Sequence, residues 1–142
     1  PFGVAELQEY TTEYFENRDR GYHYALFVDD VEETALGRAD GGHVLVQSDI
    51  PDEYGITSTQ IFAHELGHGL GLLQEAFEEI DSENPPPLSD YPSVMNYNSM
   101  NEEGYLNFSD GTHSPNDFDD WGYIEANLLV PNGSALDSNT DC

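Results

Sequence analysis

The chain contains no lysine, and its only basic residues are Arg18, Arg20 and Arg38. Against these stand 29 Asp and Glu side chains, which give the 142 residues a formal net charge of −26. Such a charge repels the phosphates of nucleic acids and the anionic headgroups of membranes, so neither is expected as a partner. The acids are spread along the chain rather than gathered in a tail. Because salt screens repulsion within a Debye length of ~3 Å at 1 M, the sequence predicts adaptation to a salt-rich medium.

Cysteine and long apolar runs are almost as scarce as lysine. Cys142 is the single cysteine, so no disulfide can form within the chain. No apolar run approaches the ~20 residues that a membrane-spanning helix needs, and no signal peptide is visible. The length suits one domain with a real core and is too short for two. We expect one soluble domain, in either the cytoplasm of a halophile or a secreted location.

The most informative stretch is residues 61–72, with the sequence IFAHELGHGLGL. His64 and His68 are four residues apart, so on a helix their imidazoles lie on the same face and can reach one metal ion. Glu65 lies beside the first histidine, where a carboxylate can deprotonate a water that the metal binds. Gly71 permits a positive φ that ends the helix and returns the chain toward the metal. This pattern is typical of zinc peptidases.

A second segment strengthens this interpretation. Downstream, Ser93, Met95 and Tyr97 follow the spacing Ser-x-Met-x-Tyr, which resembles the Met-turn of the metzincin clan of zinc metalloproteases. Gly71 also falls where metzincins keep a glycine. Across residues 57–124 the chain is most similar to compact archaeal metzincins of the selecase type.

This resemblance implies an α+β zincin fold that forms a single catalytic domain over residues 1–142. A small twisted sheet, a backing helix and the active-site helix would form an upper subdomain over residues 1–71. An irregular lower subdomain over residues 72–130 would carry the Met-turn and a C-terminal helix. Residues 131–142 are expected to be a tail.

Hydrophobic patterning predicts the individual elements. We expect a helix over residues 5–17 and strands over 22–28, 34–39 and 43–47, with 34–39 as the edge that faces the cleft. Thr57 and Gln60 have capping-box spacing and mark the start of the histidine helix. The first helix is expected to bury Leu7, Tyr10, Tyr14 and Phe15.

A final helix is expected to begin in the Ser114-Pro115-Asn116-Asp117 segment, where Ser is the cap, Pro occupies the first turn and Asp117 lies near the positive end of the helix dipole. Its inward face is expected to carry Phe118, Trp121, Tyr123, Ile124 and Leu128.

The third metal ligand is the point at which the sequence departs from the metzincin pattern. Metzincins place a histidine or aspartate three residues after the glycine, and this chain has Gln74 there. Gln74 could ligate through its weak amide oxygen, a nearby carboxylate of Glu75 or Asp81 could replace it, or the ligand could be lost. Asp81, between apolar residues and the Met-turn, is the preferred carboxylate. His113 is a further possibility, although an isolated loop histidine is more often simply solvated.

Together these residues predict a zinc-dependent endopeptidase that cleaves peptides or unfolded protein. His64, His68 and Asp81 or Gln74 would hold one catalytic Zn²⁺, and Glu65 would be the general base for a metal-activated water. The resemblance implies that Tyr97 stabilises the oxyanion and that Met95 packs beneath the metal. The alternative is a catalytically weak or inactive metzincin-like protein that binds peptides.

Overall fold

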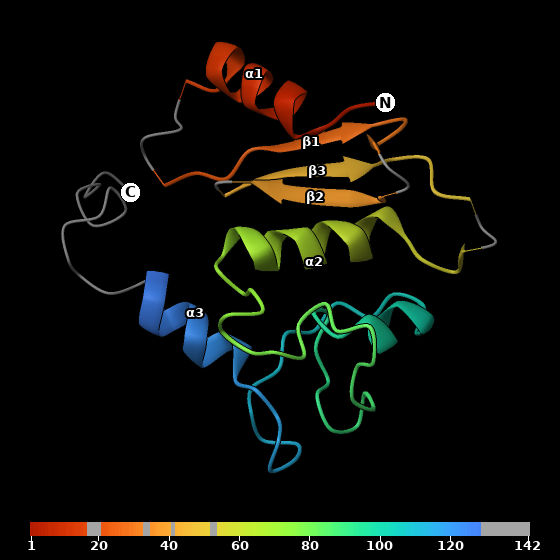
Figure 1. The fold of residues 1–142 in the computed structure, drawn as a ribbon, viewed down its shortest axis with the longest axis vertical. Helices are drawn as coiled ribbons and strands as arrows, with labels where there is room; N and C mark the ends of the chain where they lie inside the picture. The colour runs from red at the N-terminus through yellow and green to blue at the C-terminus, as the bar shows by residue number, and fades with distance from the viewer. Residues whose placement is uncertain (17–20, 33–34, 41, 52–53, 129–142) are drawn as a thin grey trace.

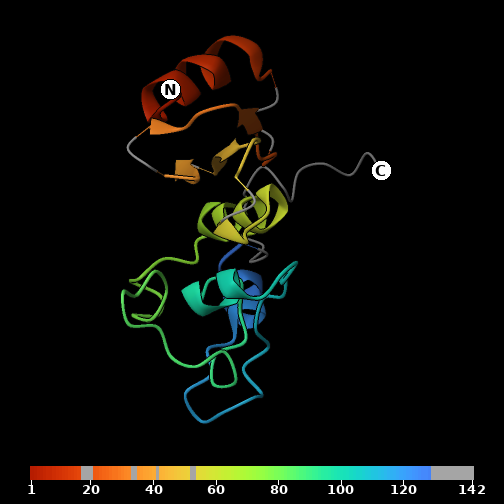
Figure 2. The same ribbon diagram turned by 90° about the vertical axis from the view of Figure 1, so that its right-hand side faces the viewer.

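The computed structural model describes residues 1–16, 21–32, 35–40, 42–51 and 54–128, and shows an α+β fold. Helix α1, a three-stranded sheet and helix α2 form successive layers, and an irregular segment with two further helices lies on the other side of α2 (Figures 1 and 2). The elements, in chain order, are α1 (Val4–Tyr14), β1 (Ala25–Val28), β2 (Gly37–Asp40), β3 (His43–Gln47), α2 (Ser58–Gly69), the 3-10 helix η4 (Tyr97–Asn101) and α3 (Asp120–Leu128).

Strand β3 is the centre of the sheet, parallel to β1 and antiparallel to β2. Val44, Leu45 and Val46 of this strand are fully buried. Both of its faces are covered, since Leu45 packs with Leu7 of α1 while Val44 and Val46 pack with Ile61 of α2. This explains why β3 is a continuous apolar run rather than an alternating one. Strand β2 is left at an edge, as expected from the sequence.

The histidine helix begins and ends as its sequence predicts. Thr57 is the N-cap, its hydroxyl accepts a hydrogen bond from the Gln60 backbone N–H at 3.2 Å, and Gln60 Oε1 accepts one from the Thr57 N–H at 3.1 Å. Helix α2 ends at Gly69, and Gly71 follows with φ +92°. Such a φ is strained for any residue with a Cβ, so Gly71 is what lets the chain turn back beneath the helix.

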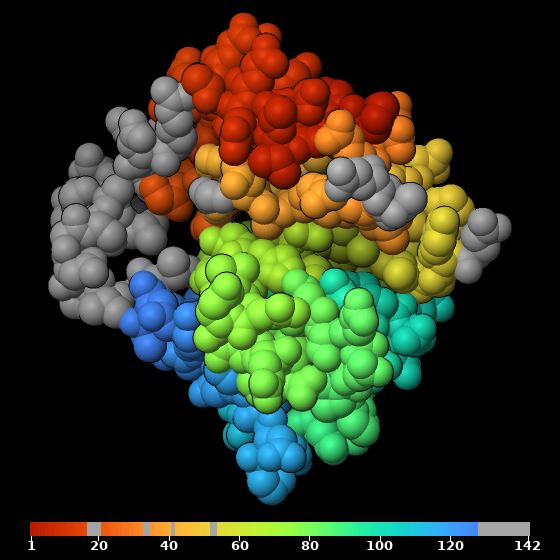
Figure 3. Space-filling view, in the orientation of Figure 1, coloured from red at the N-terminus to blue at the C-terminus, as the bar shows by residue number. Residues whose placement is uncertain are grey.

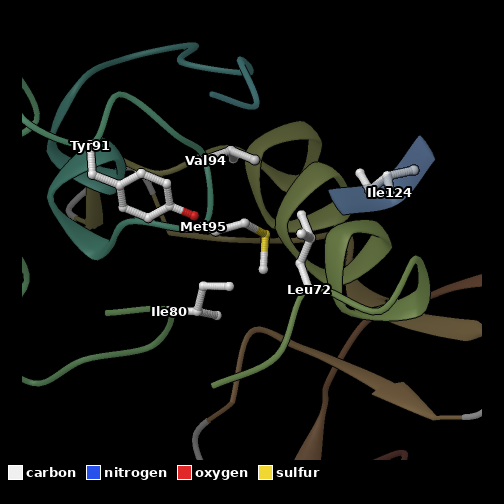
Figure 4. Close-up of a cluster of buried hydrophobic side chains, with 6 residues drawn as sticks. All are labelled: Leu72, Ile80, Tyr91, Val94, Met95 and Ile124. Carbon is white, nitrogen blue, oxygen red and sulfur yellow. The ribbon is translucent and has the colours of Figure 1, made fainter. Parts of the chain in front are cut away.

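The segment after α2 is irregular, yet it is held by its own apolar core. Leu72, Ile80, Tyr91, Val94, Met95 and Ile124 form one buried cluster, shown in Figure 4. The members come from the turn after α2, from the loops and from α3, and Ala63 of α2 packs against them, so this cluster fixes the loops against the histidine helix without regular secondary structure.

Several sequence-based expectations were wrong. The helix expected from Ser114 begins instead at Asp120, and residues 114–117 form a turn in which the Asp117 N–H donates to the Ser114 carbonyl. The Asp117 carboxylate is used within this loop, where it accepts hydrogen bonds from the Ser109 hydroxyl at 2.6 Å and the His113 N–H at 3.0 Å. It is therefore not the helix-starting acid of the sequence prediction, and Asp120 takes that place.

Three aromatic side chains predicted to face inward are exposed. Tyr10 is 38%, Tyr14 is 60% and Trp121 is 53% exposed, whereas Leu7 and Ile124 are buried as expected. The first two strands also begin later than predicted, at Ala25 and Gly37.

The coarse fold class was correct, and the division at residue 71 stays a prediction. The predicted tail, residues 131–142, and Asn17 at the end of the predicted first helix lie outside the described residues, as does the Leu128 side chain. Among the described helices, none has the length and apolarity required to cross a bilayer.

Candidate metal centre

His64 and His68 lie on one face of α2 with their rings turned toward each other. Their Nε2 atoms are 3.1 Å apart, and the ring planes are nearly perpendicular at 89°. His64 is buried, with 4% of its surface exposed, and His68 is half-buried. The i, i+4 spacing therefore brings the two imidazoles together as the sequence predicted.

The opposite ring nitrogens determine what the Nε2 atoms can do. His64 Nδ1 lies 2.9 Å from the Val94 carbonyl oxygen, and His68 Nδ1 lies 2.8 Å from the Leu72 carbonyl oxygen. A carbonyl only accepts, so each Nδ1 carries a proton and donates it. In a neutral imidazole this leaves a lone pair on Nε2, the form in which histidine binds metals.

Asp81 completes the group. Its Oδ1 lies 3.0 Å from His64 Nε2, and its Oδ2 lies 3.1 Å from His68 Nε2. Oδ1 is buried and has no hydrogen bond of acceptable geometry, as expected when it faces a lone pair rather than an N–H group. Burial opposes ionisation of Asp81, and imidazoles that carry a proton on Nε2 would overcome this by donating to the carboxylate, which lowers its pKa well below the usual range.

The loop presents Asp81 through an unusual backbone conformation. Its φ is 57°, the only positive φ of a non-glycine residue in the described ranges. Aspartate tolerates this left-handed region better than most residues, at a cost of about 1 kcal/mol or more. The preceding residue, Ile80, is fully buried in the core beside Met95. Packing of Ile80 therefore anchors the turn that brings the carboxylate to the histidines.

The donor set of His64, His68 and Asp81 fits a zinc ion. Zinc bound to nitrogen and oxygen at about 2.0–2.1 Å in a tetrahedron has its ligand atoms about 3.3 Å apart. The two Nε2 atoms here are 3.1 Å apart, and each lies 3.0–3.1 Å from a different oxygen of Asp81, so the three side chains are close enough to share one ion. Two lone pairs and a carboxylate facing one another also repel unless a cation or a proton lies between them. The chemistry and the spacing both favour a cation.

Glu65 lies beside this group, beneath strand β2. A Cβ at Gly37 would come within 2.6 Å of Glu65 Cγ, so only glycine lets the strand pass this close to the glutamate. Glu65 lines a cavity of about 350 Å³ together with His64 and Tyr97. Burial raises the pKa of Glu65, while the neighbouring imidazoles partly oppose this rise. The carboxylate is thus a stronger base than one in water.

The raised pKa of Glu65 has a consequence for stability. Ionised Glu65 destabilises the fold at pH values above its folded-state pKa, and the penalty vanishes below the unfolded-state pKa of about 4.3, where the group is protonated in both states. In metal-free protein at neutral pH, Glu65→Gln should therefore raise the unfolding temperature in molar salt, and the gain should disappear near pH 4.

Glu75→Gln is the matched control, because it removes the same charge from an exposed position. Thermal unfolding followed by circular dichroism at both pH values measures the two variants. Equal unfolding temperatures for both at neutral pH would contradict a buried, destabilised Glu65.

Tyr97 faces the centre from η4. Its ring stacks on His64 with centroids 5.7 Å apart, and 43% of its surface is exposed. Burial, and then the charge and hydrogen bond of Asp81, raise its pKa to about 12. Its hydroxyl therefore stays protonated and able to donate a hydrogen bond at any ordinary pH.

The structure separates the remaining predicted ligands from this centre. Gln74 is exposed, and its amide donates to the Asp81 backbone carbonyl at 3.5 Å, so it contacts the Asp81 loop rather than the histidines. Glu75 is also exposed. His113 belongs to another cluster, with its Nδ1 3.2 Å from Asp117 Oδ2 and 3.5 Å from Asp110 Oδ1.

Met95 lies beneath the histidine helix, fully buried. A Cβ at Gly67 would collide with the Met95 sulfur, so the thioether packs directly on the helix backbone between the two histidines. Sequence reasoning missed Asp120, a fully buried acid that accepts a hydrogen bond from Ser93 next to this methionine. Among so many acids, no sequence signal distinguishes it.

The centre lies in a recess between the sheet and the irregular segment. Figure 3 shows α2 set back between the strands above it and the loops below it. A second cavity, of about 460 Å³, lies on the His68 side and is lined by Asp40 of β2 and Tyr123 of α3.

Comparison of the chain with protein-family models, with curated proteins and with solved structures gives no match.

Proposed function

We propose that this protein is a zinc-dependent endopeptidase. The observation that carries the proposal is the convergence of two imidazole lone pairs and the Asp81 carboxylate at one point beside Glu65. Two protonated Nδ1 atoms aim these lone pairs, and an unsatisfied buried carboxylate oxygen lies opposite them. A histidine pair that merely filled space would not need both features.

His64, His68 and Asp81 would hold the ion. Zinc in such a site supplies a Lewis acid and lowers the pKa of coordinated water to about 7. Glu65, with its raised pKa, accepts the proton of the attacking water and later delivers it to the leaving amine. The same carboxylate can serve both steps because it lies at the wall of the cavity, next to His64.

Tyr97 and strand β2 supply the other contacts that peptide hydrolysis needs. The Tyr97 hydroxyl remains protonated and can donate to the oxyanion that develops on the scissile carbonyl. Strand β2 is at the edge of the sheet, above Glu65, so an extended peptide can pair with its backbone. This arrangement favours unfolded segments as substrates over compact ones.

The arrangement also supports membership of the metzincin clan. Residues 93–96 form a turn closed by the Asn96 N–H and the Ser93 carbonyl at 3.1 Å, and Met95 lies directly under the histidine helix. Metzincins take their third ligand from the position that Gln74 occupies here. The use of Asp81 in its place would distinguish this chain within the clan.

Metal content and hydrolysis in molar salt test the proposal. Protein dialysed against 1 M salt should retain about one Zn²⁺ per chain, measured by atomic emission, and should cleave casein. A chelator should abolish cleavage, and added Zn²⁺ should restore it. Lowering the salt to about 0.1 M lengthens the Debye length to ~10 Å and should weaken both folding and activity, because the charge of −26 is less screened.

Folded protein that binds no zinc would refute the proposal. Zinc-loaded protein that binds peptides without cleaving them would instead identify a peptide-binding protein with the same centre.

A further inference from the structure

Asp120 is a buried carboxylate at the start of α3, with 0% of its surface exposed. Its Oδ1 accepts a hydrogen bond from the Tyr91 hydroxyl at 2.8 Å. Its Oδ2 accepts two, from the Ser93 hydroxyl at 2.5 Å and from the Ser109 backbone N–H at 2.8 Å. Three donors thus converge on one acid that lies outside the proposed metal site.

Ser93 connects this acid to the turn under the histidines. A serine hydroxyl can donate only one hydrogen bond, and that of Ser93 donates to Asp120. Its oxygen then accepts the backbone N–H of Met95 at 3.0 Å. Because Ser93 is fully buried and donates in one direction while accepting from the other, the orientation of the turn at residues 93–96 follows from the position of Asp120.

The turn at residues 93–96 in turn orients the ring of His64. Val94 lies between Ser93 and Met95, and its carbonyl oxygen accepts the proton of His64 Nδ1 at 2.9 Å. This carbonyl shares its peptide group with the Met95 N–H, so His64 and Ser93 hold the peptide from both ends, and the Val94 N–H of the preceding peptide donates to the Asn107 carbonyl at 2.6 Å. Rotation of this peptide would free the His64 ring or favour the other tautomer, in which Nε2 carries the proton and has no lone pair.

We propose that Asp120 is a positioning residue that acts through Ser93 on the Val94 carbonyl and so holds His64 in its metal-binding tautomer. The inference rests on the proposed function, in which His64 is a ligand. A carboxylate suits the role because it only accepts hydrogen bonds, and Oδ2 takes the side chain of Ser93 and the backbone of Ser109 together. The competing explanation is that Asp120 only stabilises the start of α3.

Ser93→Ala and Tyr91→Phe separate these explanations. Each variant removes one buried hydroxyl that donates to the same carboxylate, so each should lower the unfolding temperature. Of these two hydroxyls, only that of Ser93 also bonds the turn, where it accepts the Met95 N–H. Ser93→Ala should therefore weaken Zn²⁺ binding by about 10–100-fold, the usual cost of losing a partner behind a ligand, while Tyr91→Phe changes it by no more than about twofold.

Asp120→Asn gives a third, conservative test. Its amide oxygen can still accept from Ser93 and Ser109 while its NH₂ group donates to the Tyr91 hydroxyl. It should therefore bind Zn²⁺ much more tightly than Ser93→Ala.

Two readouts measure these variants: competition against a chromophoric chelator in 1 M salt, and the tautomer of the His64 imidazole in metal-free protein by ¹⁵N NMR. The expected result is a loss of Nδ1-protonated His64 in Ser93→Ala and not in Tyr91→Phe. Equal zinc affinities and equal tautomer populations in these two variants would overturn the inference. If wild-type protein bound no zinc, the proposed function would fail, and the NMR comparison would still decide this inference.

Discussion

Replacement of Glu65 by glutamine is expected to lower kcat/KM for peptide hydrolysis by about 10²–10⁴-fold, the usual contribution of a positioned acid–base group. Glutamine has nearly the shape of glutamate, so the side chain still packs beneath Gly37 and lines the same cavity. It can accept a hydrogen bond from water but cannot take its proton. The loss should therefore fall on kcat, with bound zinc and peptide affinity nearly unchanged.

Steady-state cleavage of a fluorogenic peptide in molar salt, alongside zinc content, measures this effect. Glu75→Gln removes one negative charge at an exposed site and should retain wild-type activity. If Glu65→Gln kept its activity with zinc bound, Glu65 would not be the base. Its expected loss of activity, together with its expected gain in metal-free stability, would mark Glu65 as a residue retained for chemistry at the expense of the fold.

Replacement of Asp81 by asparagine is expected to weaken zinc binding by more than the ~10–100-fold that an outer partner costs, since a direct ligand loses its charge. Asparagine also tolerates the positive φ of this position, so the turn anchored by Ile80 should remain. Gln74→Ala should leave the affinity unchanged, because Gln74 is exposed and contacts the loop backbone.

Competition titration of the metal-free variants with a chromophoric chelator gives both affinities under one set of conditions. Circular dichroism checks that each variant is folded. The opposite pattern, with affinity lost in Gln74→Ala and kept in Asp81→Asn, would restore the ligand position that the metzincin pattern predicts.

Asp81 illustrates how far local patterns reach. The sequence offered Gln74, Glu75 and Asp81 as alternatives, and preferred Asp81 only because apolar residues and the turn surround it. What the structure adds is the burial of the neighbouring Ile80 in one cluster with Leu72 and Met95, which lie 8 and 15 residues away in the chain. No periodicity within the loop specifies that contact.

For the final helix, the local sequence predicted a start that the structure places elsewhere. Ser114 and Asp117 look like a helix start, and locally they do form a turn with side chain-to-backbone hydrogen bonds. In the structure the Asp117 carboxylate accepts from the Ser109 hydroxyl within the loop, whereas Asp120 accepts buried donors where α3 begins. Both residues are helix-starting acids by type, so only the loop that reaches them distinguishes one from the other.

The sequence by itself determined what depends on neighbours along the chain. The i, i+4 spacing of His64 and His68, the Thr57 cap and the Gly71 turn are local, and the structure has each of them. The sequence favoured Asp81 without separating it from the alternatives, and only the tertiary structure shows that Asp81 meets the histidines and that Asp120 lies behind the turn beneath them. The physical reason is that the burial and the hydrogen-bond partners of a side chain depend on other segments that pack against it. Nothing in the local sequence of the 29 acidic residues distinguishes those that become buried.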